Sequence, residues 1–136
     1  MLPVTFEIMT PKTLPDALNI LHDRKDQVRI LAGGTDVIPR LKDEAIHPKL
    51  LMDLTKLKAD LCQINVDNGF LRIGSLVTHT QICQSDIINN TLPVLAQACR
   101  MVGSWQIRNR GTIGGNIANA SPAGDTLPVL LALDAI

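Results

Sequence analysis

Short apolar runs separated by polar segments dominate the first part of the chain. They occupy residues 5–8, 28–32 and 50–54, and their length and β-branched or leucine-rich composition are typical of buried strands. A helix is predicted after Thr13, whose side chain can cap it, and a second, short helix is predicted over 36–42. Strands that alternate with helices in this way predict a small, mostly parallel β-α-β layer.

The pattern changes in the second part of the chain. Apolar and polar residues alternate over 62–66 and resume over 71–73, and the Asp-Asn-Gly sequence at 67–69 favours a hairpin turn between them. This pattern predicts antiparallel sheet. We therefore expect an α+β chain with two subdomains, residues 1–55 and 56–136.

Helical patterns follow the predicted hairpin. Thr78 is predicted to cap a short helix that ends at Gln84, and Thr91 to cap a longer helix that Gly103 ends. The apolar run 128–133 predicts a further, buried helix. Because apolar residues are still accumulating at the last position, we expect the natural chain to continue beyond it.

Two glycine pairs, Gly33-Gly34 and Gly114-Gly115, indicate places where the backbone lies close to something large. The first follows a predicted strand, and the second lies in a run of small residues over 112–125. Glycine permits positive φ and lets backbone N–H groups approach an anion. Either pair alone could be a simple turn, but a hydroxyl or amide side chain follows each one (Thr35, Asn116), which favours ligand binding. Two anion-binding loops predict a dinucleotide, whose pyrophosphate they would share.

Neither glycine pair belongs to a common nucleotide-binding motif. Neither reads G-x-G-x-x-G, and neither has the Gly-Lys-Ser/Thr ending of a P-loop. A Rossmann fold and a P-loop fold are therefore disfavoured.

The composition excludes several classes of function. Lys+Arg and Asp+Glu are both 13 and aromatic residues are 2%, so neither a basic surface nor stacking side chains are available for nucleic acid. No apolar run is long enough for a membrane span, and the N-terminus lacks a signal-peptide pattern, which predicts a cytoplasmic protein. The three cysteines include no C-x-x-C, so buried thiols are expected rather than a disulfide or metal site.

A few polar residues are candidates for ligand contact. Asp125 would accept hydrogen bonds from a sugar diol or cap the helix after it, and Asp36 has the same alternatives. Arg108 and Arg110 could neutralise phosphate, although ion pairs are favoured, and His79 could approach a ligand near a helix start. No nucleophile–base pair or metal cluster is recognisable, so no catalytic and no metal-binding residue is predicted. A cofactor would supply any chemistry.

The chain resembles a known family in several segments. They are Leu31-Ala32-Gly33-Gly34-Thr35-Asp36, Arg72-Ile73-Gly74-Ser75 with Thr78-His79, and Ile107-Arg108-Asn109-Arg110-Gly111-Thr112-Ile113-Gly114-Gly115-Asn116 with Ala120-Ser121-Pro122-Ala123-Gly124-Asp125. They resemble the FAD-binding, or medium, subunit of the molybdenum hydroxylases, which include xanthine dehydrogenase and aerobic carbon monoxide dehydrogenase. The resemblance covers the whole chain.

The resemblance implies a two-subdomain FAD-binding fold of the PCMH, or vanillyl-alcohol oxidase-like, type, truncated at its C-terminus. It implies that Asn119 and Asp125 lie along the adenosine or ribityl portion of FAD, and Val102 and Gly103 near the adenine. It further implies that the pyrophosphate is held from two sides, by Leu31, Ala32, Gly33, Gly34, Thr35, Asp36, Val37 and Ile38 and by Thr112, Gly114, Gly115 and Asn116.

The resemblance also implies a function. Such a subunit passes electrons from iron–sulfur clusters on one partner subunit, supplied by molybdopterin on another, through FAD to NAD+ or another acceptor. The alternatives are a non-catalytic nucleotide- or phosphate-binding module and an interaction scaffold that exposes an apolar face.

Overall fold

The computed structural model describes residues 6–136 and divides the chain into two compact units, Met1–Asp60 and Leu61–Ile136. The division falls inside the short helix α3 (Lys58–Leu61), later in the chain than the boundary predicted at residue 55. Each unit is described separately below.

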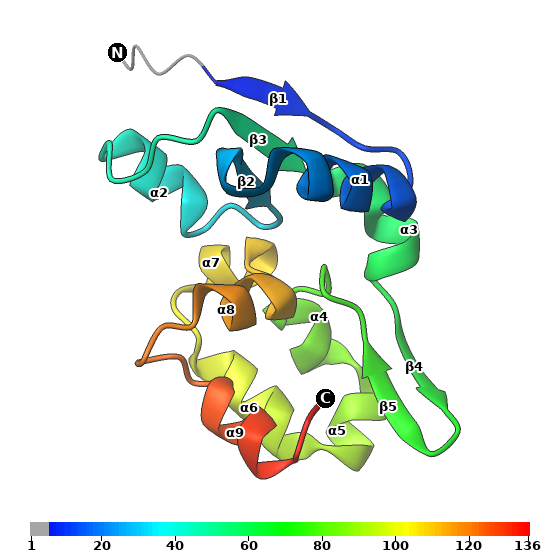
Figure 1. Cartoon of the computed structure of the whole chain (residues 1–136). Coiled ribbons are helices and arrows are strands. Elements are labelled where there is room, and N and C mark those ends of the chain that lie inside the picture. The colour runs from blue at the N-terminus through cyan, green and yellow to red at the C-terminus, as the bar shows by residue number, and fades with distance from the viewer. Residues whose placement is uncertain (1–5) are drawn as a thin grey trace. The chain divides into compact units, whose positions relative to one another are not determined.

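A parallel three-stranded sheet forms the centre of the first unit (Figure 1). Its strands are β1 (Glu7–Met9), β2 (Val28–Leu31) and β3 (Leu50–Asp53), in the order β1-β3-β2. β3 pairs with both neighbours, and its first three residues are buried, as expected for an apolar strand covered on both faces. The predicted parallel layer is confirmed, although β1 lies later than the predicted run 5–8, whose first residue is outside the described part of the chain.

Helices connect these strands. Thr13 caps α1 (Leu14–Arg24), since its hydroxyl oxygen accepts a hydrogen bond from the backbone N–H of Asp16 at 3.3 Å. α2 (Val37–Lys42) follows β2 and buries Leu41. Single 3₁₀ turns, η1 (Lys25–Gln27) and η2 (Thr55–Leu57), precede β2 and α3. The two predicted helices of this unit are thus confirmed.

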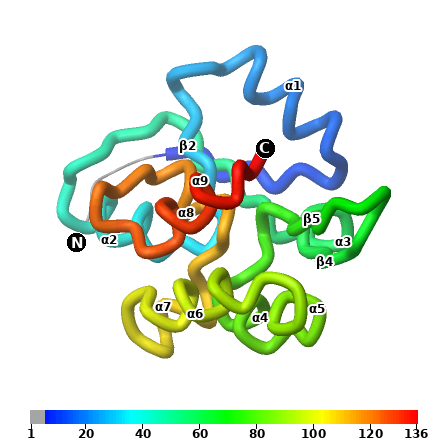
Figure 2. The backbone as a smooth tube through the Cα atoms, turned by 90° about the horizontal axis from the view of Figure 1, so that it is seen from below, coloured from blue at the N-terminus to red at the C-terminus, as the bar shows by residue number. Residues whose placement is uncertain are grey.

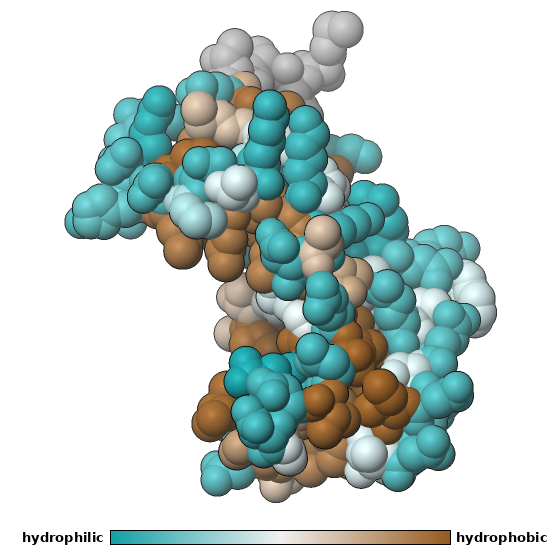
Figure 3. Space-filling model, turned by 90° about the vertical axis from the view of Figure 1, so that its right-hand side faces the viewer, coloured by the Kyte–Doolittle hydropathy of each residue, from teal (hydrophilic) through white to brown (hydrophobic). Residues whose placement is uncertain are grey.

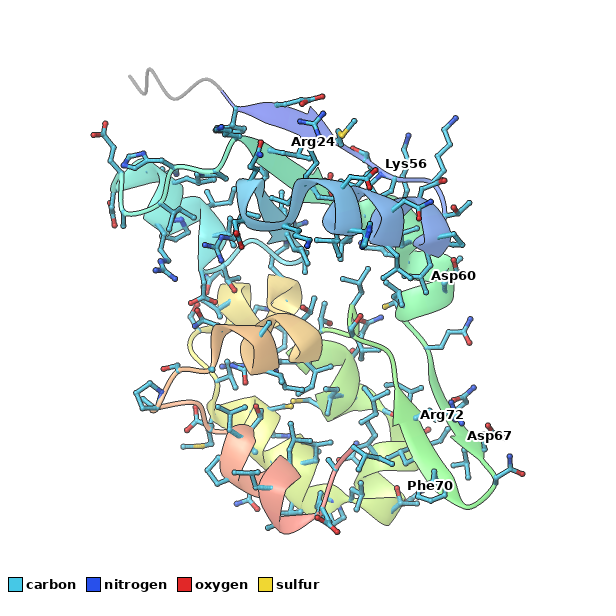
Figure 4. The ribbon with its side chains drawn as sticks, in the orientation of Figure 1. Arg24, Lys56, Asp60, Asp67, Phe70 and Arg72 are labelled. Atoms are coloured by element: carbon cyan, nitrogen blue, oxygen red, sulfur yellow. The ribbon has the colours of Figure 1, made fainter. Side chains whose placement is uncertain are left out.

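The second unit begins with the predicted hairpin. β4 (Ile64–Asp67) and β5 (Phe70–Ile73) pair in antiparallel register, and the turn residues Asn68 and Gly69 both have positive φ, at 50° and 80°. Positive φ at both central residues is the geometry of the tight hairpin turn that Asn-Gly favours. Figure 4 shows Arg72 and Asp67 on this hairpin, where Arg72 Nε lies 3.0 Å from Asp67 Oδ2.

Helices make up the rest of the second unit, and four of them pack side by side (Figure 2). These four are α4 (His79–Gln84), α5 (Asp86–Thr91), α6 (Pro93–Met101) and α7 (Trp105–Arg110), and α8 (Ile113–Asn119) and α9 (Leu127–Ala132) follow. The buried core of this unit consists of Val77, Ile82, Ile88, Leu95, Ala96, Cys99 and Ile113. Some apolar side chains, such as Phe70, are instead exposed, and Figure 3 shows hydrophobic residues reaching the surface.

The predicted cap at Thr91 is wrong. Thr91 is the last residue of α5, a helix that the sequence analysis missed, and its hydroxyl donates to the carbonyl of Ile87 at 2.7 Å. Ser85 caps α5 instead, and α6 begins at Pro93 without a side-chain cap. Proline suits a helix start because its missing N–H would have no partner there. The cap predicted at Thr78 is confirmed.

Candidate functional site

The first glycine pair lies in the turn between β2 and α2. Gly34 has φ +80°, whereas Gly33 is not among the positive-φ residues. A Cβ on Gly34 would lie 3.1 Å from Leu31 Cδ1 and 3.2 Å from Ile38 Cγ1, tighter than most real contacts. Only glycine therefore fits this position without strain.

The backbone N–H groups of Ala32, Gly33, Gly34 and Thr35 are the candidates for binding an anion. Within the described part of the chain, none of these N–H groups donates a hydrogen bond to a protein acceptor. The turn is held at its ends instead, because Leu54 N–H donates to Leu31 O and Ile38 N–H donates to Gly34 O, both at 3.0 Å. Successive half-buried N–H groups that lack protein acceptors fit the oxygens of a phosphate.

The residues after this turn begin α2. Asp36 stands at the N-cap position, but its side chain does not cap the helix, so the capping alternative is not observed. Its Oδ2 lies 3.5 Å from the Thr35 hydroxyl, which donates to it. Val37 and Ile38 form the first turn, and the Ile38 side chain is exposed.

The second glycine pair is not a loop. Gly114 and Gly115 lie in the first turn of α8, and neither has positive φ, so the prediction that this pair frees the backbone for positive φ is wrong. Thr112 caps the helix, since its Oγ1 accepts from Gly115 N–H at 3.1 Å. A Ser/Thr cap before the glycines was the signal for a helix start.

Glycine is required at 114 for a different reason. A Cβ there would lie 2.6 Å from Ser75 Cβ and 2.7 Å from the Ser75 carbonyl oxygen. The Gly114 N–H donates to that same carbonyl oxygen at 3.0 Å. Close backbone approach, not chain reversal, therefore explains this glycine. Sequence reasoning missed the role of Ser75, because nothing in the sequence pairs it with Gly114.

The N–H groups of this first helical turn already have protein acceptors. Ile113 N–H donates to Val77 O and Asn116 N–H to Thr112 O, both at 2.9 Å, beside the bonds of Gly114 and Gly115. This turn does not offer a phosphate the open N–H groups that the first turn offers.

The amide and carboxylate candidates lie after these glycines. Asn116 Oδ1 accepts a short hydrogen bond from the hydroxyl of Thr126, which is fully buried, so this side chain ties α8 to the segment before α9. Thr126, not Asp125, is the N-cap residue of α9, so the capping alternative for Asp125 is not observed. Asn119 ends α8, and both it and Asp125 are exposed.

Val102 and Gly103 connect α6 to α7. Arg108 Nη1 donates to both of their carbonyl oxygens, at 3.1 Å and 2.8 Å. The Arg108 guanidinium also lies 5.9 Å from the centre of the Trp105 ring. Arg108 thus stabilises this turn, and the ion pair favoured for it does not appear among the described residues.

His79 is the most buried of the candidate polar residues, at 2% exposed. Its Nδ1 has no hydrogen-bond partner among the described residues, and burial, then the nearby Arg108 charge, lowers the pKa of the imidazole. Of the cysteines, Cys99 is buried, whereas Cys62 and Cys83 are partly exposed. The described residues contain no cluster of ligands suited to a metal ion, and none of their helices is long and apolar enough to cross a bilayer.

Comparisons with known proteins place the chain in a family. Residues 4–136 match the family described as FAD binding domain in molybdopterin dehydrogenase. The chain is 38% identical over 135 residues to the caffeine dehydrogenase subunit beta of Pseudomonas sp. (strain CBB1), covering 99% of this chain and 45% of that protein. It is 43% identical over 131 residues to the nicotinate dehydrogenase FAD-subunit of Eubacterium barkeri, covering 96% and 44%.

A solved structure supports the same assignment. Carbon monoxide dehydrogenase from Hydrogenophaga pseudoflava, in a form that lacks the Mo-pyranopterin moiety, superimposes with a TM-score of 0.87 at 32% identity, covering 93% of this chain and 44% of that one. This likeness confirms the predicted class, an α+β FAD-binding fold. The chain spans about half the length of these relatives. It belongs to the family of FAD-binding domains found in molybdopterin dehydrogenases, the oxidoreductases in which FAD is the cofactor of this domain.

Proposed function

We propose that this chain binds FAD and forms part of the flavoprotein subunit of a molybdopterin-dependent dehydrogenase. The observation that carries the proposal is the turn at 32–35, where successive backbone N–H groups lack acceptors among the described residues. A dinucleotide has the phosphate oxygens that such a turn binds. Family membership identifies the dinucleotide as FAD.

Each unit has a distinct part in this binding. In the first unit, the N–H groups of residues 32–35 donate to the pyrophosphate, and Asp36, Val37 and Ile38 border it. In the second unit, the α8 backbone at Gly115 approaches the ligand, while Gly114 holds the start of that helix against Ser75. Thr112 and Asn116 act through the helix cap and the bond to Thr126 rather than through free N–H groups.

The remaining candidates recognise the nucleoside. Asp125 and Asn119 are exposed, and their oxygens accept hydrogen bonds from sugar hydroxyls. Val102 and Gly103 offer backbone near the adenine, in a turn that Arg108 holds fixed. When bound, the flavin supplies the redox chemistry, and the protein supplies binding and orientation.

The names of the relatives support a role in a larger complex. One is called a FAD-subunit and another a subunit beta, and carbon monoxide dehydrogenase has a medium chain. We propose that partner subunits carry the iron–sulfur clusters and molybdopterin, and that electrons leave through FAD to NAD+ or another acceptor.

Two glycines with the same φ provide the test. Gly34 and Gly69 both have φ +80°, but Gly34 lies in the proposed phosphate turn and Gly69 in the β4–β5 hairpin. Replacing either with alanine costs about 1 kcal/mol of backbone strain. We expect Gly34→Ala to weaken FAD binding at least about tenfold, as one lost charge-assisted hydrogen bond would, and Gly69→Ala to leave it unchanged. Titration of FAD fluorescence measures both, and equal affinities would contradict the proposal.

A phosphate-binding module without flavin is the second candidate. It is favoured by the observation that only one of the two glycine motifs presents N–H groups without acceptors. In that case ADP should bind as tightly as FAD, and riboflavin should not compete. A flavoprotein should instead bind FAD much more tightly than ADP, since the flavin end adds contacts.

A further inference from the structure

The start of α8 is attached to the segment that leads into α4. Gly114 N–H donates to Ser75 O at 3.0 Å, Ile113 N–H to Val77 O at 2.9 Å and His79 N–H to Gly111 O at 3.1 Å. Thr78 and Thr112 pair between these bonds in an isolated antiparallel bridge. The backbone of 75–79 thus fixes where the second glycine pair lies.

The side chain at one end of this attachment is a buried histidine. His79 is 2% exposed, and its Nδ1 finds no acceptor or donor among the described residues. A neutral imidazole can leave one nitrogen unprotonated there at moderate cost. A protonated imidazole carries an N–H at both nitrogens and requires an acceptor for each, which this position lacks at Nδ1.

The charged groups around His79 also disfavour a second positive charge. The helices packed against α4 are α5, α6 and α7. Burial is the larger cause that lowers the pKa of the imidazole, and the positive charge of Arg108 on α7 is the second. On α6, the Arg100 side chain donates to Cys83 O and Asn89 Oδ1. Arg110 of α7 and Asp86 of α5 are exposed. Burial raises the pKa of the thiols of Cys83 and Cys99.

We propose that His79 is a positioning residue which holds the second glycine pair against residues 75–79 only while its imidazole is neutral, so that acid detaches the start of α8 and weakens FAD binding. The part of this proposal that concerns FAD rests on the proposed function. The attachment of 111–114 to 75–79 does not, and it can be measured without the cofactor.

The direction of the effect follows from linkage. The pKa of His79 lies below its ordinary value of 6.5 in the folded protein, so the unfolded or detached form binds the proton more tightly. The stability contributed by the neutral His79 is therefore fully present above about pH 6.5, and it is lost as the pH decreases from there through the lowered pKa. The same pH range should release the imidazole from its buried site.

Hydrogen exchange at the amides of Ile113 and Gly114 tests the attachment directly. These N–H groups donate to Val77 and Ser75, so their protection factors should fall at least about tenfold between about pH 7 and about pH 5. His79→Gln, which cannot take up a proton, should show protection that is independent of pH over this range. His22→Gln and His47→Gln replace exposed histidines and should behave as the parent protein does.

Variants of Arg108 keep the test decisive if His79→Gln fails to fold. Arg108→Gln removes the positive charge near the imidazole, which brings the folded-state pKa of His79 closer to its ordinary value, so acid should reduce protection less than in the parent. Arg108→Lys keeps the charge while losing the planar contact with Val102 and Gly103, so its acid-induced loss should match the parent. Equal losses for Arg108→Gln and the parent, or a pH-dependent His79→Gln, would overturn the proposal.

The cofactor measurement separates this inference from the proposed function. FAD affinity should fall in the same pH range in which the Ile113 and Gly114 amides lose protection, and His79→Gln should remove that dependence. If the amides respond to pH but FAD binds at no pH, the proposed function fails and the attachment stands. If FAD binds and its affinity ignores both pH and His79→Gln, the link from His79 to the cofactor is wrong.

Discussion

At the scale of single residues, the two glycine pairs have different physical reasons for being glycine. Gly34 has a backbone conformation that other residues avoid, and the N–H groups beside it lack acceptors among the described residues. Gly114 is helical and is glycine because the Ser75 backbone lies against it. The sequence predicted that both pairs matter but not that they differ, because a glycine pair looks the same whether it permits a turn or a close contact.

Substitutions within the second glycine pair test whether the contact with Ser75 is the reason for glycine at 114. Gly114→Ala and Gly115→Ala both gain about 1 kcal/mol of helix propensity, so that term cancels between them. Gly114→Ala places a Cβ against the Ser75 backbone, whereas Gly115→Ala meets only the Thr112 hydroxyl at 2.9 Å. We expect Gly114→Ala to be less stable by about 2 kcal/mol in urea unfolding, as overpacking usually costs. Similar midpoints for the two variants would show that the α8 contact with Ser75 is loose.

At the scale of elements, sequence patterns identified the strands and most helices but not every boundary. The apolar runs and the Asn-Gly turn predicted both sheets, because period and turn chemistry act locally. The helices α3, α5 and α7 were missed and α8 was predicted as a loop. α5, α7 and α8 begin at capping residues (Ser85, Ser104 and Thr112), but they are short and depend on packing rather than on a long periodic pattern.

The corrected helix caps make a prediction of their own. Thr78 and Gln81 form a reciprocal capping box on α4, whereas Thr91 donates to Ile87 at the end of α5. Thr78→Ala should therefore lower the free energy of unfolding by about 1 kcal/mol, as loss of an N-cap does. Thr91→Ala should change it by less than half of that. Thermal unfolding followed by circular dichroism measures both. A larger effect at Thr91 would support the helix cap that the sequence predicted there.

At the scale of the whole molecule, the proposed ligand contacts are divided between the two units. The open N–H groups belong to the first unit, and α8, Asp125 and the Val102–Gly103 turn belong to the second. The resemblance to the family predicts this division of contacts, and it stays a prediction. It could not predict that the N–H groups of the second motif are occupied, since their acceptors at Ser75 and Val77 are distant in sequence.

Trp105 makes this division measurable, because it is the one tryptophan in the sequence and lies in the second unit. FAD at about 100 times its dissociation constant adds about 2.7 kcal/mol of stability, which for a unit of this size raises the midpoint by about 10 °C or more. We expect Trp105 fluorescence to report that rise. Gly34→Ala, a change in the first unit, should cut the rise to about half at the same FAD concentration, because a tenfold weaker affinity leaves about 1.4 kcal/mol of stabilisation. An undiminished rise in Gly34→Ala would mean that FAD stabilises the second unit without the 32–35 turn.

The strand order β1-β3-β2 has a consequence for synthesis on the ribosome. β1 and β2 emerge first, but within residues 6–136 each pairs only with β3, whose residues 50–53 are translated later. The nascent chain must therefore keep two strands unpaired until the third has left the exit tunnel, and such exposed edges are where newly made chains associate wrongly. A translational pause before residue 50 would prolong this state, so the yield of folded protein should depend on codon speed there more than anywhere in the hairpin that follows.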